Sequence, residues 1–148
     1  LLAVEFLIYV LYALVSLITL LLVSGMAWGV HLRGSWVSFA GNWLLTVLST
    51  LSIGMMVGGI AKNTKSASVI ACVLYFPMLI FSGATLPFEV MPEIVQKVIR
   101  VFPMTQGIQF MKSAFLGLSV EHFTLPILVM LAVTLACSGI AVKCFKWE

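Results

Sequence analysis

The sequence predicts an all-α integral membrane protein with four membrane-spanning helices. Its 148 residues are 62% apolar and 9% charged, whereas soluble domains are about 45–50% apolar and about 25% charged. About 20 residues of helix cross the hydrocarbon core of a bilayer, and a backbone in lipid must satisfy its own hydrogen bonds. We therefore expect helices in four uncharged stretches of 19 or more residues: Phe6–Val30, Trp36–Ile60, Ser66–Ala84 and Phe123–Val142.

The second stretch carries a polar stripe. Ser38, Asn42, Thr46 and Ser49 recur at the spacing of one helix face. Such side chains tie membrane helices together through hydrogen bonds, or they line a path for a substrate. The pattern leaves both interpretations open for Asn42, Thr46 and Ser49.

The connection between the second and third stretches is purely basic. It contains Lys62 and Lys65 and no acidic residue, which favours the cytoplasmic side of a membrane. The other Lys and Arg residues bring the count to four on each side, so charge alone orients the chain weakly. With four spans, both ends of the chain would lie on the same side as Lys62 and Lys65.

The segment between the third and fourth stretches is punctuated by Pro87, Pro92 and Pro103. It predicts a short helix pair, at about residues 91–102 and 105–117, and each helix is too short to span a bilayer. Such helices are re-entrant or interfacial, or they lie on the surface with no special role. In the first, an apolar face is expected from Ile94, Val95, Val98, Ile99 and Phe102. In the second, it is expected from Ile108, Met111, Phe115 and Leu118.

Several chemical functions lack their residues in this sequence. Five Glu and no Asp are present, and the three cysteines have neither metal-site spacing nor a close pair. We expect Cys72, Cys137 and Cys144 to be small packing residues. There is no Gly-x-x-x-x-Gly-Lys-Ser/Thr phosphate loop, and the small, dispersed net charge of +3 does not indicate nucleic-acid binding.

Three short motifs follow one another around the proline-punctuated segment. They are Phe-Ser-Gly-Ala-Thr-Leu-Pro at Phe81–Pro87, Met91-Pro92, and Val-Phe-Pro-Met-Thr-Gln-Gly at Val101–Gly107. Their order and spacing resemble the permease subunit of ABC-2 type exporters, and the resemblance covers nearly the whole chain. One departure is that no Arg follows the Pro-Met-Thr turn; Lys112 is the nearest base.

The resemblance implies that residues 1–148 are the last four spans of a six-span permease domain, with the first two spans before Leu1. It places a re-entrant helix pair near an external gate and the connection with Lys62 and Lys65 in the cytosol, facing an ATPase. The implied gate residues are Ser82, Gly83, Leu86, Pro87, Pro103, Thr105 and Gly107.

The implied partners are an ATP-binding subunit, a second permease copy or sister permease, and the bilayer. ATP and Mg²⁺ would be bound by the ATP-binding subunit, so this chain would hold no cofactor and would not be the enzyme. The implied location is the cell membrane.

The function implied by this resemblance is ATP-driven export. Uncharged spans suit an amphipathic or apolar cargo, such as a drug, a peptide or a lipid-linked molecule. One alternative is a fragment of an ion-coupled secondary transporter, which Pro77 would fit as a helix interruption, although such carriers need ionisable groups within the membrane. Another alternative is a non-transporting membrane subunit.

Overall fold

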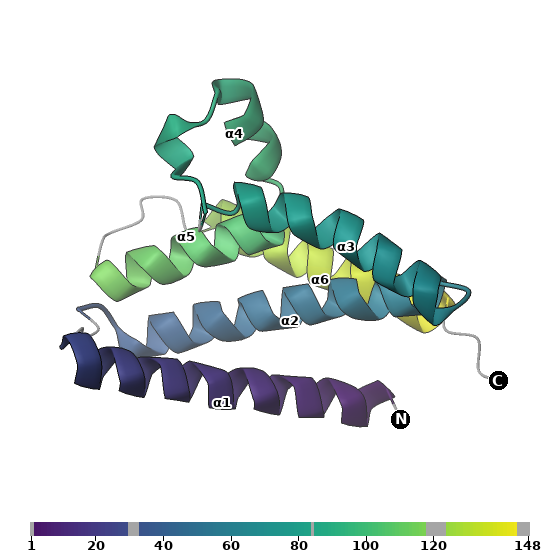
Figure 1. Cartoon of the computed structure of the whole chain (residues 1–148), viewed down its shortest axis with the longest axis horizontal. Helices are drawn as coiled ribbons and strands as arrows, with labels where there is room; N and C mark the ends of the chain where they lie inside the picture. Colours follow the sequence, from purple (N-terminus) through teal and green to yellow (C-terminus); the bar gives the residue numbers. More distant parts are fainter. Residues whose placement is uncertain (1, 30–32, 84, 118–123, 145–148) are drawn as a thin grey trace.

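A computed structural model describes residues 2–29, 33–83, 85–117 and 124–144 of the chain. The described part is helical and contains no strand, which confirms the predicted all-α class (Figure 1). In chain order, the elements are α1 (Leu2–Trp28), α2 (Trp36–Ile60), α3 (Thr64–Phe81), the 3₁₀ turn η1 (Phe88–Val90), α4 (Glu93–Ile99), α5 (Pro103–Leu116) and α6 (Thr124–Cys144).

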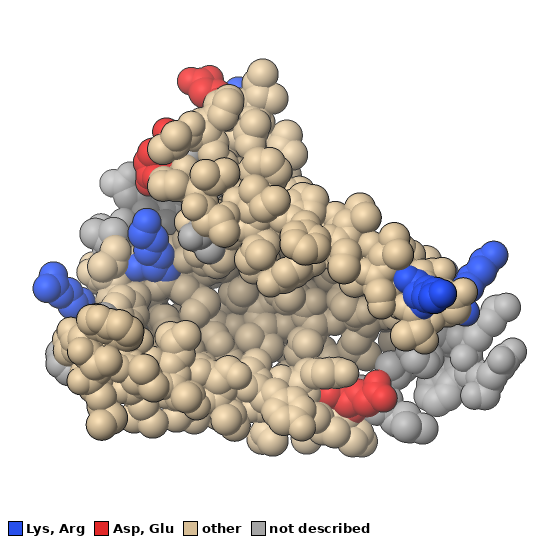
Figure 2. Space-filling view, viewed as in Figure 1, with Lys and Arg blue, Asp and Glu red and all other residues tan. Residues whose placement is uncertain are grey.

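Four of these helices, α1, α2, α3 and α6, are long and apolar enough to cross a membrane. Figure 2 shows Lys, Arg and acidic side chains at the two ends of the long helices and around α4, with an uncharged surface between them. That distribution matches a hydrocarbon slab bounded by two aqueous interfaces. The chain is therefore a membrane protein with four candidate spans.

The ends of the spans depend on local capping. Helix α2 has the bounds that hydropathy predicts, but α3 begins at Thr64 and ends at Phe81. The side chain of Asn63 caps its first turn, accepting a hydrogen bond from the Ser66 amide at 2.8 Å. At the other end Gly83 has a φ of +83°, which takes the chain out of the helix. The helix therefore begins two residues before and ends three residues before the approximate bounds Ser66–Ala84 expected from hydropathy.

The short helices also differ from their predicted bounds. Helix α4 covers only Glu93–Ile99. Helix α5 begins at Pro103 and not at Thr105, because proline has no N–H and suits the first position of a helix. It ends where Gly117 adopts a left-handed conformation, with a φ of +70°.

The described core is centred on α2, which packs most extensively on α6 and next on α5. A polar seam joins α2 to α6. The Ser49 hydroxyl lies 2.8 Å from the Thr134 hydroxyl, and the Ser138 hydroxyl donates to that of Ser52 at 3.1 Å. Ser49 and Ser52 are fully buried. Hydrogen bonds between small polar side chains are a common means of joining membrane helices.

We predict that Ser49→Ala and Thr134→Val each destabilise the fold, and that the double variant is less destabilised than the sum of the two. The expected coupling is about 0.6 kcal/mol, and at most about 1.7 kcal/mol, as for hydrogen bonds between other membrane helices. A double-mutant cycle of unfolding free energies in bilayer mimics measures it. Thr19→Val, which removes a bond made within α1 only, serves as the control, and strict additivity would contradict the seam.

Candidate re-entrant helix and translocation path

Helix α5 runs antiparallel to the first part of α2. The rings of Phe39 and Phe115 meet edge to face, with centroids 6.1 Å apart. Thr46 lies seven positions after Phe39 on α2, and it contacts Gly107, which lies eight positions before Phe115 on α5. The opposite direction of these two steps establishes the antiparallel arrangement, which is visible in Figure 1.

This contact fixes the level of α5 along α2. Thr46 is ten positions after Trp36, the first residue of α2. At 1.5 Å per residue this is about 15 Å along the axis, which is about half of a hydrocarbon core of about 30 Å. If α2 crosses the bilayer along its length, the first turn of α5 reaches the middle of the membrane and its last turn returns to the surface.

Close backbone packing makes this approach possible. Gly107 is buried, and a Cβ at this position would collide with the side chain of Thr46. At the other end of α5, a Cβ on Gly34 would collide with the carbonyl of Ala114. Helices in membranes commonly approach each other through such small residues.

The connection that precedes α2 also holds the end of α5. The backbone N–H of Arg33 donates to the carbonyl of Phe115 at 3.0 Å. A Cβ on Gly117 would lie 3.2 Å from the Arg33 carbonyl oxygen. Helix α5 is thus held against α2 at Thr46 and against the α1–α2 connection at Arg33.

The buried face of α5 is not the predicted apolar stripe. The buried residues are Pro103, Thr105, Gln106, Gly107 and Phe110. In contrast, Ile108, Met111 and Phe115 are only half-buried, and Leu118 lies outside the described residues. Helices in lipid approach each other closely at small residues, and on α5 this residue is Gly107, which does not belong to the apolar stripe.

Two buried polar groups lie at the start of α5. The Gln106 amide donates to the Arg100 carbonyl at 2.6 Å, which ties α5 to the end of α4. The Thr105 hydroxyl is fully buried and has no hydrogen-bond partner in the described part of the chain.

The predicted polar stripe of α2 divides between different surroundings. Ser49 lies in the seam with α6, so for this residue the structure shows a helix contact. The hydroxyl of Thr46 donates to the Asn42 carbonyl at 2.7 Å, and the side chain contacts Gly107. Asn42 is half-buried, and within the described residues its side-chain amide makes no hydrogen bond. Ser38 is exposed.

The predicted gate residues fall into two groups. Ser82, Pro103, Thr105 and Gly107 are buried, whereas Leu86 and Pro87 are exposed and Gly83 is half-buried. The Ser82 hydroxyl donates to the Leu79 carbonyl at 2.8 Å, so it caps α3. The structure therefore gathers the buried group where α3 ends and α5 begins, two helices that contact each other.

The apolar face predicted for α4 is only partly buried. Ile99 is 1% exposed, but Ile94 and Val98 are 78% and 56% exposed. The helix turns Ile99 toward the rest of the chain, Val95 is half-buried, and Ile94 and Val98 remain on the surface. The basic residues at the opposite end are also exposed: Lys62 lies in the connection before α3, and Lys65 is the second residue of α3 and not part of the loop.

Some contributors to the site were not predicted. Ser52, Thr134 and Ser138 belong to the α2–α6 seam. The four-residue spacing of Thr134 and Ser138 in the sequence was the signal that could have predicted them.

Among the described residues, no group of three His, Cys, Asp or Glu side chains is placed to hold a metal ion. What the arrangement offers is an uncharged, closely packed helix surface on α2, against which the short helix α5 lies antiparallel.

Sequence comparison identifies the family. The family described as ABC-2 family transporter protein matches residues 1–143. The chain belongs to the ABC-2 transporter family. Members of this family are membrane subunits that generally work with a separate ATP-binding component.

Three relatives illustrate the similarity. The inner membrane transport permease YhhJ of Escherichia coli K12 is 31% identical over 77 residues, 52% of this chain and 21% of that protein. The probable multidrug ABC transporter permease YbhS of the same organism is 26% identical over 110 residues, 74% of this chain and 29% of that protein. Nodulation protein J of Neorhizobium galegae is 28% identical over 81 residues, 55% of this chain and 31% of that protein.

The aligned residues thus span less than a third of the length of each of these relatives. No solved structure matches the chain significantly. The family therefore establishes a transporter membrane subunit, and the structure of this ABC-2 chain shows how α5 packs on α2.

We predict that Gly107→Ala destabilises the fold by about 1–3 kcal/mol, the usual cost of overpacking, because the new Cβ collides with Thr46. Adding Thr46→Ala should restore part of the loss, because it removes Oγ1 and Cγ2, the two nearest colliding atoms, and leaves the Cβ of residue 46 at 2.9 Å from the new Cβ. Thermal unfolding of the purified protein measures both effects. Gly41→Ala, where a Cβ meets no atom within 4 Å, is the matched control. If Thr46→Ala gave no rescue, α5 would not be seated on α2 as described.

Proposed function

We propose that this chain forms part of the membrane-spanning permease of an ATP-driven exporter. The observation that carries the proposal is a short helix, α5, packed antiparallel against the candidate span α2 in a member of the ABC-2 transporter family. We infer that α5 is re-entrant. Such a helix closes one side of a bilayer without crossing it, as an external gate would. The gate would be formed where α3 ends and α5 begins, by Ser82, Gly83, Leu86, Pro87, Pro103, Thr105 and Gly107.

Energy for transport would come from an ATP-binding subunit. Within the described spans, the charged side chains are confined to the helix ends, such as Glu5 in the first turn of α1 and Lys143 in the last turn of α6. Ion-coupled carriers use ionisable groups within the membrane, so this arrangement favours coupling to ATP. Lys62 and Lys65 would face the ATPase on the cytoplasmic side of the cell membrane, and the ATPase would bind ATP and Mg²⁺. Both ends of the chain would lie on the same side.

A second permease, either a copy or a sister subunit, would complete the path. The described spans expose large apolar side chains along α1 and α3, which suit lipid or another membrane helix. An uncharged path between two permeases would take an amphipathic or apolar cargo, such as a drug, a peptide or a lipid-linked molecule. The relative named as a probable multidrug permease is consistent with this class. Asn42 would offer the hydrogen bonds of its side-chain amide to the polar part of such a cargo, while Thr46 beside it packs against α5.

Purification of the intact protein from its native membranes in mild detergent tests the proposal. We expect an ATP-binding component at near-equal stoichiometry, or fused to the permease, and vanadate-sensitive ATP hydrolysis. Transport in vesicles should continue when ion gradients are collapsed and should stop when the ATPase is inactivated. Transport that depends on the gradient and not on ATP would replace the proposal with an ion-coupled carrier. An intact protein with neither ATPase nor transport would favour a non-transporting subunit.

We further predict that Gly83→Arg impairs transport more than it lowers protein abundance. Any side chain at a φ of +83° carries backbone strain, about 1–2 kcal/mol in the left-handed region. The space around a Cβ here is otherwise open, so Gly83→Ala bears the same strain without the charge or bulk. Transport assayed per folded molecule separates the two effects. Equal losses for the Ala and Arg variants would make Gly83 a purely structural position.

A further inference from the structure

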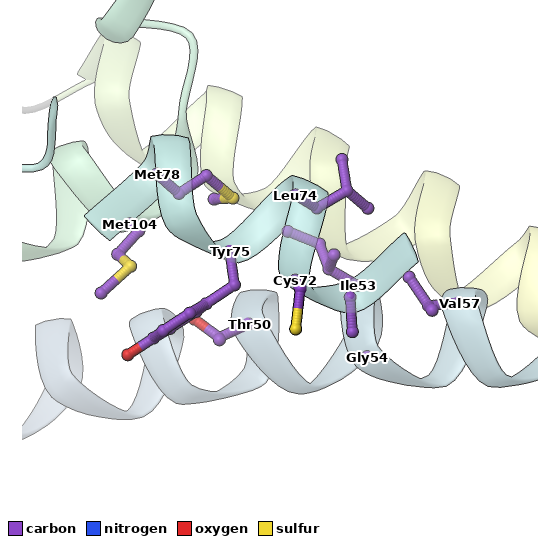
Figure 3. A pocket seen from close by; sticks show the side chains of 10 residues that line it. Thr50, Ile53, Gly54, Val57, Cys72, Leu74, Tyr75, Met78 and Met104 are labelled. Carbon is purple, nitrogen blue, oxygen red and sulfur yellow. The ribbon is translucent and has the colours of Figure 1, made fainter. Parts of the chain in front are cut away.

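A cavity of about 290 Å³ lies between α2 and α3 (Figure 3). Thr50, Gly54 and Val57 line it from α2, and Tyr75 and Met78 line it from α3. In Figure 3 the ring of Tyr75 extends from α3 toward Thr50. Met104, in the first turn of α5, lines it from the side of the re-entrant helix.

The walls offer almost no polar atom to a ligand. The Thr50 hydroxyl is already used, because it donates to the Thr46 carbonyl at 2.8 Å within its own helix. The volume is at the lower limit of cavities that bind drug-sized molecules, about 300–1,000 Å³. An alkyl chain fits these walls better than a molecule that must be oriented by hydrogen bonds.

The cavity lies in the half of the membrane that borders the basic connection. Val57 and Thr50 are three and ten positions before Ile60, the last residue of α2. They therefore lie about 5 and 15 Å from that helix end. Lys62 and Lys65 follow immediately and are both exposed, and basic residues at a membrane surface attract anionic lipid headgroups.

We propose that this cavity binds an acyl chain of an anionic phospholipid from the adjacent leaflet, with the lipid phosphate next to Lys62 and Lys65. This lipid site requires that the chain spans a membrane, but it does not depend on the proposed direction of transport or on the proposed cargo. The bound chain fills the space between α2 and α3 and contacts Met104 at the start of α5. It is thus a lipid component of the packing around the re-entrant helix.

A photoreactive phosphatidylglycerol with a diazirine midway along one acyl chain tests the proposal. The intact protein is placed in nanodiscs that contain the probe, irradiated, digested and analysed by mass spectrometry. We expect adducts on Met78, which is buried from the outer surface, and on Met104, which is half-buried. Leu135 on α6 is exposed and reports ordinary contact with bulk lipid.

Filling the cavity should remove the two methionine adducts and leave the Leu135 adduct. Ala71 lines the cavity from α3, so Ala71→Phe is the test variant. Ala40→Phe is the matched control on an exposed alanine of α2, and it should keep all adducts. If Ala71→Phe does not fold, Gly54→Leu fills the same space, since a Cβ at Gly54 meets no atom within 4 Å. Labelling of Leu135 without the methionines, or methionine adducts that persist in the filled variant, would overturn the proposal.

Discussion

Helix α2 contacts every other long helix in the described part of the chain, and its closest contacts depend on small side chains. Lipid tails are as apolar as leucine, so burying apolar surface between two membrane helices brings little gain. Close approach and interhelical hydrogen bonds must hold the helices together instead. On α2 these are the hydroxyl seam of Ser49 and Ser52 with α6, and the contact of Thr46 with Gly107 on α5. Two faces of α2 are therefore packed against α6 and α5. Its remaining surface borders cavities and the more loosely packed helices α1 and α3.

The position of the re-entrant helix follows from these contacts. A helix that stops within a bilayer is possible only when protein or water satisfies its backbone. If α5 is re-entrant as proposed, it meets this condition by lying against α2, by starting with a proline that has no N–H, and by the hydrogen bond from the Arg33 N–H to the Phe115 carbonyl in its last turn. The segments that are less tightly held, α3 and the outward face of α4, border the point where α5 begins. A gate at this position would combine a firmly held helix with more loosely packed neighbours.

The sequence was sufficient for the parts of the fold that depend on solvent. The four spans, the bounds of α2 and the existence of two short helices follow from hydropathy and prolines, because a bilayer imposes its thickness on the chain. The ends of α3 were missed, because they depend on the Asn63 cap and on the conformation of Gly83. The buried face of α5 does not follow from its apolar stripe, because such a stripe does not identify the packed side in lipid. The pattern of Ser38, Asn42, Thr46 and Ser49 could not separate contact from path, because that distinction requires the position of Thr134 on α6.

The seating of α5 along α2 is the central structural claim, and cross-linking in native membranes tests it most directly. In the intact protein with Cys72, Cys137 and Cys144 replaced, Phe39→Cys and Phe115→Cys are combined and treated with a short bifunctional thiol reagent. The account predicts an intramolecular cross-link, since the two rings are in edge-to-face contact. It predicts none between Phe39→Cys and Leu135→Cys, because Leu135 adjoins Thr134, which pairs with Ser49 ten positions farther along α2. Two reactive thiols at positions 39 and 115 that fail to cross-link would show that α5 does not lie along α2.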